Sequence, residues 1–264
     1  MQSSARPSPV ASIMRFLVLS VVSAGLIVAC GHDVPSRLAG VVDSSKSPTR
    51  IMVFGGNRSC KPDGHNKLSP LTTDLARNIT GMINRMRASG ADLEIMLACF
   101  TGPGEVLLSY NFSHELETET PEGLVARGVK YADPDARLIL IGHSYGGWTA
   151  MTVAEEVARK SARSGSVVAG LVTIDPISRK NCTYTSWSNC VTAPADFTEE
   201  RLEFLRHASK YWANFFQRKT PWLHSSRISQ AHFNKELDAT HFNIDMHQHL
   251  WRHVELLLHD RLTP

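Results

Sequence analysis

The sequence lacks the marks of several protein classes. No run of basic residues occurs, and 28 Lys and Arg against 25 Asp and Glu leave a net charge of +3 in 264 residues. This balance does not indicate a nucleic-acid-binding surface. No Cys-x-x-Cys pair, internal repeat or low-complexity tract is present, so we expect neither a zinc site nor a repeat protein. Hydrophobic residues make up 42% of the chain and charged residues 20%. That is typical of a globular fold, not of a disordered, collagen-like or coiled-coil chain.

The apolar run at residues 16–29 is too short to cross a bilayer as a helix, which takes about 20 residues. Its length matches the hydrophobic region of a signal peptide, and residues 1–29 contain two arginines and no acid. We therefore expect residues 1–29 to be a signal peptide that starts at Met1 or at Met14. The alternatives are an uncleaved N-terminal anchor and an ordinary secretory signal that leads to no lipidation.

The apolar run ends in Ile27-Val28-Ala29-Cys30, which resembles the bacterial lipobox. In that motif the cysteine is lipidated and becomes the mature N-terminus. The resemblance implies that a lipid anchor at Cys30 attaches the protein to a membrane of the bacterial cell envelope, on its periplasmic or extracellular face. Residues 30–49 are then the lipidated cysteine and a flexible tether, because the stretch is polar and rich in Ser, Pro and Asp. The folded domain is expected at residues 50–264.

Export makes the other four cysteines candidates for disulfides, which persist in an oxidising compartment. Three pairings are possible. Cys182 and Cys190 bracket a short loop, which favours a local bridge between them. Cys60 follows the first expected strand and Cys99 ends the second, so these two can meet across neighbouring strand ends. The alternative is four buried thiols.

Apolar runs alternate with stretches of helical periodicity. The runs are apolar throughout, which indicates a mostly parallel sheet covered by helices on both faces, and so the α/β class. Strands are expected at residues 51–54, 93–100, 138–141, 167–174 and 212–217, the last of these being the final strand. Helices are expected at residues 71–88, 121–131, 145–162, 198–206 and 242–259. Residues 105–112 form either a further strand or an irregular crossing segment.

The sequence Gly-His-Ser-Tyr-Gly-Gly at residues 142–147 lies between an expected strand and an expected helix. In this order a G-x-S-x-G motif indicates a sharp turn that lifts Ser144 above the edge of the sheet, while the glycines let the strand and helix approach. The alternative is an unreactive turn or a phosphate-binding turn, but no phosphate-loop Lys-Ser/Thr pair follows it.

With FGGN at residues 54–57, TIDP at 173–176 and THFNI at 240–244, this motif resembles the α/β-hydrolase superfamily of serine esterases, lipases and thioesterases. The resemblance runs from about residue 50 to residue 259. It implies an α/β-hydrolase fold, with a mostly parallel sheet, helices on both faces and a small lid. It also implies a catalytic triad in the chain order Ser, Asp, His.

A serine hydroxyl is a weak nucleophile and needs a base within hydrogen-bond reach. Twelve histidines are candidates, and the resemblance favours His241, in a loop just before the C-terminal helix. His224 and His232 are the runners-up. His143, next to the nucleophile Ser144, is expected to pack beside the turn.

The acid of the triad orients the histidine and stabilises its charged form. Asp175 closes an expected strand and precedes a proline, so its side chain emerges at the carboxyl edge of the sheet, where ligand sites form. This early position resembles that of some lipases. Asp238, three residues before the histidine, is the main rival, and Asp245 is a weaker one.

An oxyanion hole needs two backbone N–H donors. One is expected from Tyr145, directly after the nucleophile, and the other from Gly56 or Asn57 after the first strand. The alternative for the second loop is a simple strand-ending turn. Trp187, inside the expected 182–190 disulfide loop, is the candidate for an apolar wall of the substrate pocket.

These residues predict a serine hydrolase that cleaves carboxylic esters or thioesters of small molecules through an acyl-enzyme, with Ser144, His241 and Asp175 as its triad. The chemistry requires neither a metal nor an organic cofactor. Two other functions stay open: a non-catalytic envelope lipoprotein that uses the hydrolase scaffold to bind a ligand, and an amidase or peptidase on the same scaffold.

Overall fold

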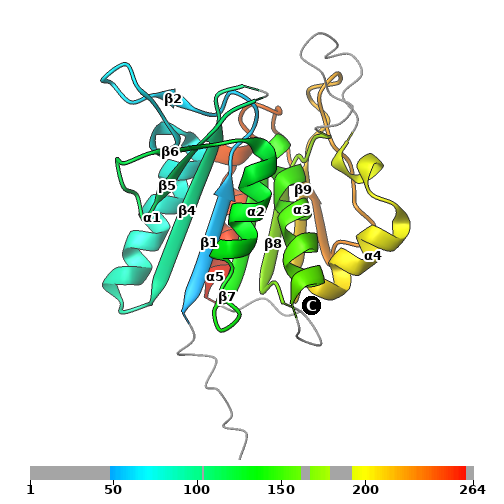
Figure 1. Cartoon of the computed structure of the whole chain (residues 1–264). Coiled ribbons are helices and arrows are strands. Elements are labelled where there is room, and N and C mark those ends of the chain that lie inside the picture. Colours follow the sequence, from blue (N-terminus) through cyan, green and yellow to red (C-terminus); the bar gives the residue numbers. More distant parts are fainter. Residues whose placement is uncertain (1–47, 103, 162–166, 179–191, 260–264) are drawn as a thin grey trace, which may run out of the picture. The chain divides into compact units, whose positions relative to one another are not determined.

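The computed structural model describes residues 48–102, 104–161, 167–178 and 192–259. The expected signal peptide, the Cys30 anchor, Trp187 and the Cys182–Cys190 bridge lie outside these residues. The described part forms one eight-stranded sheet in the order β10-β9-β8-β7-β1-β4-β5-β6, with a small two-stranded sheet beside it (Figure 1). The expected mostly parallel sheet with helices is confirmed.

Neighbouring strands are parallel from β10 to β4, whereas β5 and β6 continue the sheet antiparallel at one edge. The strands of the large sheet are β1 Thr49–Phe54, β4 Leu93–Phe100, β5 Val106–Tyr110, β6 Glu117–Glu119, β7 Arg137–His143, β8 Gly170–Ile174, β9 Trp212–Phe216 and β10 Phe233–Glu236. The small sheet pairs β2 Lys61–Pro62 with β3 Leu68–Ser69.

The strand order reverses its direction between the neighbouring strands β1 and β7. The chain runs from β1 to β4 on one side and from β7 to β8 on the other, so the connections leave these two neighbours in opposite directions. In an open α/β sheet, ligands bind outside the carboxyl ends of two such strands. Gly55 follows β1 and Ser144 follows β7, so both lie at the expected position of a site.

Helices cover both faces of the sheet, and side chains alternate between the faces along each strand (Figure 1). Along β1, Ile51 and Val53 pack with the helices α1 and α5, and Met52 and Phe54 pack with α2, α3 and α4. The helices are α1 Asp74–Ala88, α2 Pro121–Tyr131, α3 Tyr145–Lys160, α4 Glu199–Ala208 and α5 Gln248–Leu258, with short 3-10 turns η1 Pro70–Thr72, η3 Ala193–Asp196 and η4 Ile244–Met246.

Two details of the end of the chain differ from expectation. The run at residues 212–217 was expected to be the final strand, but β10 follows it and pairs parallel with β9. β10 has the sequence FNKE and lies at the edge of the sheet, where the half-buried Asn234 and the exposed Lys235 and Glu236 replace an apolar run. The helix expected at residues 242–259 divides into η4 and α5, with His247 between them. In addition, residues 105–112 contain a true strand, β5.

No helix in the described ranges is long and apolar enough to span a membrane.

The disulfide expected between Cys60 and Cys99 is present. It joins the segment after β1 to β4, across neighbouring strands of the sheet. Further bonds run in parallel with it: Gly55 N–H donates to Ala98 O at 2.8 Å, and Phe100 N–H donates to Ser59 Oγ at 3.1 Å. The loop at residues 55–60 is therefore fixed to the sheet at both ends.

Replacing both Cys60 and Cys99 by serine should lower the free energy of unfolding by about 3 to 4 kcal/mol, because the bond closes a loop with a sequence separation of 39. Urea unfolding followed by tryptophan fluorescence measures the loss. Wild-type protein treated with reductant should unfold at a similarly lowered urea concentration. An unchanged midpoint in the double variant would contradict a bond in solution.

Candidate active site

Ser144 stands on a strained turn between β7 and α3. Its φ of 56° and ψ of −123° lie in a region that residues with side chains rarely occupy, and such strain concentrates at functional sites. Two glycines make the turn possible. A Cβ on Gly142 would lie 2.1 Å from the carbonyl oxygen of Gly146, and a Cβ on Gly146 would lie 2.1 Å from that of Phe54.

The Ser144 hydroxyl is directed to a histidine instead of the helix. A serine at a helix N-cap usually accepts a hydrogen bond from the first turn, but Ser144 makes no such bond. Its Oγ lies 2.9 Å from Nε2 of His241, which comes from the loop between β10 and η4. Both side chains are buried. This is the contact that transfer of the hydroxyl proton requires.

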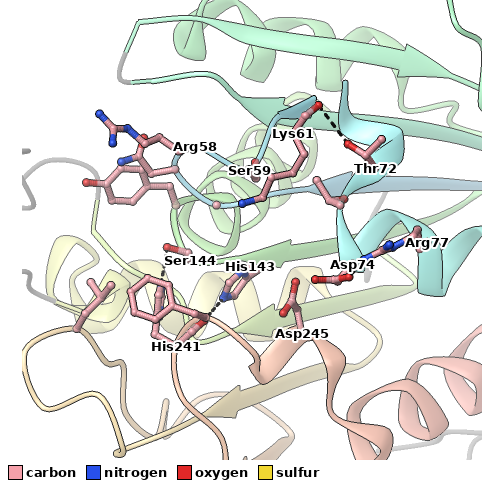
Figure 2. Close-up of a pocket in the computed structure, with 16 residues that line it drawn as sticks. Arg58, Ser59, Lys61, Thr72, Asp74, Arg77, His143, Ser144, His241 and Asp245 are labelled. Carbon is pink, nitrogen blue, oxygen red and sulfur yellow. Dashed lines mark hydrogen bonds and ion pairs between the residues drawn. The ribbon is translucent and has the colours of Figure 1, made fainter. Parts of the chain in front are cut away.

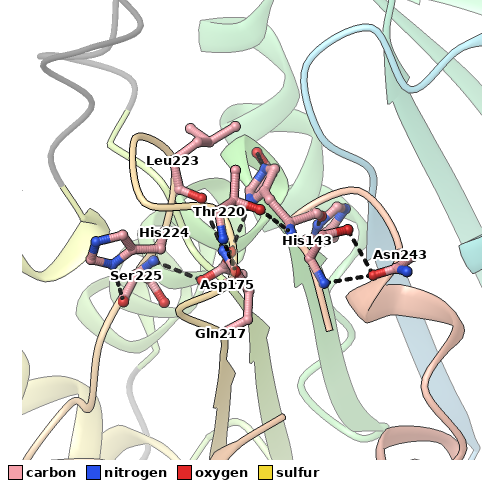
Figure 3. A network of polar contacts seen from close by, with 11 residues as sticks. His143, Asp175, Gln217, Thr220, Leu223, His224, Ser225 and Asn243 are labelled. Atoms are coloured by element: carbon pink, nitrogen blue, oxygen red, sulfur yellow. Dashed lines mark hydrogen bonds and ion pairs between the residues drawn. The ribbon is translucent and has the colours of Figure 1, made fainter. Parts of the chain in front are cut away.

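Asp175 completes the chain of hydrogen bonds. Its Oδ2 lies 2.7 Å from Nδ1 of His241. The same oxygen accepts a second bond of 2.7 Å from Nε2 of Gln217, while Oδ1 accepts from the N–H of Ser225 at 2.7 Å (Figure 3). Burial of the carboxyl raises its pKa, but these bonds from His241, Gln217 and Ser225 outweigh burial and hold the pKa of Asp175 below its ordinary value. The acid is therefore a carboxylate at neutral pH.

His143 contacts the backbone of His241. Its Nε2 lies 2.9 Å from the carbonyl oxygen of His241, so this nitrogen carries a proton and donates it. Burial lowers the pKa of His143 and keeps the ring neutral. The contact fixes the backbone of the loop that carries His241, which agrees with a packing role for His143 rather than a role as base.

The rival residues do not join this chain of hydrogen bonds. The side chain of Asp238 is 84% exposed and pairs with Lys219 at 2.6 Å. His224 Nδ1 contacts the carbonyl oxygen of Ser225, and His232 Nδ1 accepts from the N–H of Trp212. Asp245 lines the cavity in front of Ser144 instead.

The loop after β1 approaches Ser144 closely enough to serve an oxyanion hole. A Cβ on Gly56 would lie 2.9 Å from the Cβ of Ser144, so glycine is needed at this position. Gly56, Asn57 and Tyr145 all line the cavity in front of the serine. Backbone donors from two different loops thus border the space where a carbonyl oxygen would lie, and their role as oxyanion donors stays a prediction.

A cavity of about 340 Å³ opens in front of Ser144 and His241 (Figure 2). This volume is at the lower end of the range for small-molecule sites. Leu223 and Phe242 give it an apolar side, and Phe242 is 63% exposed and lies against Trp222. The ionic lining residues are Arg58, Lys61, Asp74, Arg77 and Asp245. The expected wall residue Trp187 lies outside the described residues.

The model of the alpha/beta hydrolase family matches residues 89–261. The chain belongs to this family. Among solved structures, it is similar to an alpha-beta serine hydrolase homologue from Coxiella burnetii, with 14% identity, 82% of this chain and 89% of the other covered, and a TM-score of 0.39. The NocB thioesterase domain from the nocardicin cluster has 9% identity, coverage of 83% and 96%, and a TM-score of 0.40. The Vlm2 thioesterase domain has 16% identity, coverage of 81% and 93%, and a TM-score of 0.38. No curated protein matches the chain.

Two residues that the sequence did not predict hold Asp175 and His241 in place. Gln217 is fully buried, and its amide nitrogen donates to both Asp175 Oδ2 and the carbonyl oxygen of Leu223. Thr220 accepts from the backbone N–H of His241 through its hydroxyl, and its own N–H donates to Gln217 Oε1. The one available signal was local: Gln217 is the first polar residue after the apolar strand β9.

Within the ranges that the structure describes, no three His, Cys, Asp or Glu side chains come together as metal ligands would.

Proposed function

We propose that this protein is a serine hydrolase that cleaves carboxylic esters or thioesters through an acyl-enzyme. The observation that carries the proposal is the buried chain of two hydrogen bonds from Ser144 Oγ through His241 to Asp175, which opens on a small-molecule cavity. Acyl transfer by a serine uses a nucleophile, a base and an orienting acid in this order.

In the first half of the reaction, Ser144 Oγ attacks the carbonyl carbon and its proton moves to Nε2 of His241. The C–O or C–S bond of the tetrahedral intermediate then breaks, and the leaving group takes the proton from His241. Asp175 carries negative charge throughout, because the pKa of its carboxyl is held low. It keeps Nδ1 of the imidazole protonated and stabilises the imidazolium that forms in each step.

In the second half, a water molecule gives a proton to His241 and its oxygen attacks the acyl carbon. The new tetrahedral intermediate releases the carboxylic acid, and Ser144 regains its proton. The negative charge on the substrate oxygen in both intermediates is stabilised by N–H groups of Tyr145 and of Gly56 or Asn57. Donors that are already oriented stabilise such charge without reorganisation, and each is worth about 3 to 4 kcal/mol of barrier.

The binding-module alternative predicts a histidine turned away from the serine. His241 Nε2 lies 2.9 Å from Ser144 Oγ, so the geometry gives that alternative no support. An amidase would use the same groups, and only the leaving group distinguishes it from an esterase.

The test combines hydrolysis with covalent labelling. Purified protein is assayed with p-nitrophenyl butyrate, an acyl thioester and the matching p-nitroanilide. It is then incubated with a fluorophosphonate, and peptide mass spectrometry locates the label. The proposal expects turnover of an ester or thioester and a label on Ser144. Turnover of the anilide alone would make the protein an amidase, and a protein with neither turnover nor label would not be a serine hydrolase.

We also propose that Cys30 carries a lipid anchor in the bacterial envelope, on the strength of the sequence around it. Full-length protein expressed in a bacterial host should then enter the detergent phase in a Triton X-114 partition. Cys30→Ala protein should remain in the aqueous phase or keep its N-terminal segment. Equal partitioning of the two proteins, with residues 1–29 removed from both, would exclude a lipid at this position.

A further inference from the structure

The loop that follows β1 brings two cationic side chains to the cavity. Arg58 and Lys61 line it together with Ser144, and Figure 2 shows the Lys61 side chain extending toward the space in front of the serine. Among the residues that the structure describes, the Lys61 ammonium has no ion-pair or hydrogen-bond partner. A charge-assisted partner for it therefore has to come from the ligand or from solvent.

The backbone holds this cationic loop in one position. Cys60, directly before Lys61, is bonded to Cys99, and its N–H donates to the carbonyl oxygen of Phe100 at 3.3 Å. Arg58 has a φ of 55°, a strained value for a residue with a long side chain. The loop that carries the cations is the same loop that brings Gly56 to the serine. Its fixed backbone thus sets the distance between cations and reaction centre.

The acids of the cavity lie on a different wall. Asp74, from α1, is ion-paired with Arg77, and Asp245 belongs to η4 (Figure 2). Among the described residues, Arg77 and Asp74 of the cavity lining pair with each other, whereas Lys61 lies across the cavity from them. The loop after β1 thus presents the Lys61 ammonium to the cavity, and a cationic group in a cleft concentrates anions.

We infer that the site selects esters or thioesters that carry an anionic group, a carboxylate or a phosphate, and that Lys61 binds this group. The inference rests on the proposed function and names its substrate class. Since the cavity holds only a small molecule, the anion lies within a few bonds of the reacting carbonyl. Lys61 thus determines specificity, and it takes no part in proton transfer.

Two matched pairs of esters test the inference. The p-nitrophenyl monoester of hexanedioic acid against p-nitrophenyl hexanoate places the charge on the acyl side. The ester 4-butanoyloxybenzoate against 4-butanoyloxybenzamide places it on the leaving group. We expect the anionic member of at least one pair to have a kcat/KM about tenfold higher, as one charge-assisted hydrogen bond would give. The preference should shrink at high salt.

The variant Lys61→Met keeps the aliphatic length and removes the charge. It should lose most of the tenfold preference. Lys67→Met is the matched control, because Lys67 is exposed in the same short hairpin but does not line the cavity. It should keep the wild-type preference. Equal kcat/KM values within both pairs for the wild type, or equal ratios in the two variants, would overturn the inference and leave the proposed hydrolase intact.

A binding measurement tests the anion site even if the proposed hydrolase activity is absent. If the wild type hydrolyses none of the esters, the proposed function is wrong, and calorimetry with hexanedioate and hexanediamide then decides the inference alone. Preferential binding of hexanedioate, reduced about tenfold by Lys61→Met and unchanged by Lys67→Met, supports an anion site. Equal or absent binding of both probes refutes it.

Discussion

Replacing Ser144 by alanine should lower kcat for ester hydrolysis by about 10⁵- to 10⁶-fold and abolish the fluorophosphonate label, since loss of the nucleophile disables the whole triad. The fold should tolerate the change. The Ser144 hydroxyl makes no cap bond to α3, and alanine meets the positive φ with a Cβ in the same position as that of serine. The loss of kcat therefore reflects the missing nucleophile and not unfolding. A melting temperature close to that of the wild type verifies that the variant is folded.

Ser229→Ala is the matched control for this variant. Ser229 is exposed, and its hydroxyl contacts only the neighbouring Gln230 among the bonds of the described residues. Its loss should leave both kcat and labelling unchanged. Ser144→Ala protein that still hydrolysed the ester and still took the label would show that another residue is the nucleophile.

The strained turn and the strand ends could be predicted because their signals are local. The glycines around Ser144 report a close approach within a few residues of chain, and the proline after Asp175 marks the end of a strand. His241 was identified through its place in the chain order of a known family. The structure brings these three residues together, as their predicted positions required.

The residues that hold Asp175 and His241 in place could not be predicted, because they depend on contacts between distant segments. Gln217 lies 42 residues from Asp175, and Thr220 lies 21 residues from His241. The strand β10 could not be predicted either, because an edge strand with exposed polar side chains has no apolar run. The position of Lys61 in the cavity depends on the path of the loop after β1, which the disulfide at Cys60 fixes.

Asp175→Asn should lower kcat by about 10³- to 10⁴-fold with little change in KM, because the acid orients His241 and touches no substrate atom. Three donors face the carboxylate: His241 and Gln217 at Oδ2, and the N–H of Ser225 at Oδ1. An asparagine has one oxygen, so its NH₂ group must oppose a donor on one side in either orientation. If the NH₂ group faces His241, the imidazole carries its proton on Nε2 and cannot accept the proton of Ser144. If the NH₂ group faces Ser225, the negative charge that stabilises the imidazolium is still absent.

Asp238→Asn separates the assigned acid from its rival in the sequence. Asp238 is almost fully exposed and pairs with Lys219 at the surface, where an ion pair contributes little. Its loss should change kcat less than twofold. The buried unpaired donor in Asp175→Asn costs about 1 to 3 kcal/mol of stability, so both variants are compared at a temperature where circular dichroism shows them folded. A large loss of kcat in Asp238→Asn with an active Asp175→Asn would move the acid to the loop before His241, and the buried carboxylate would then serve only to hold the segment from Gln217 to Ser225 in place.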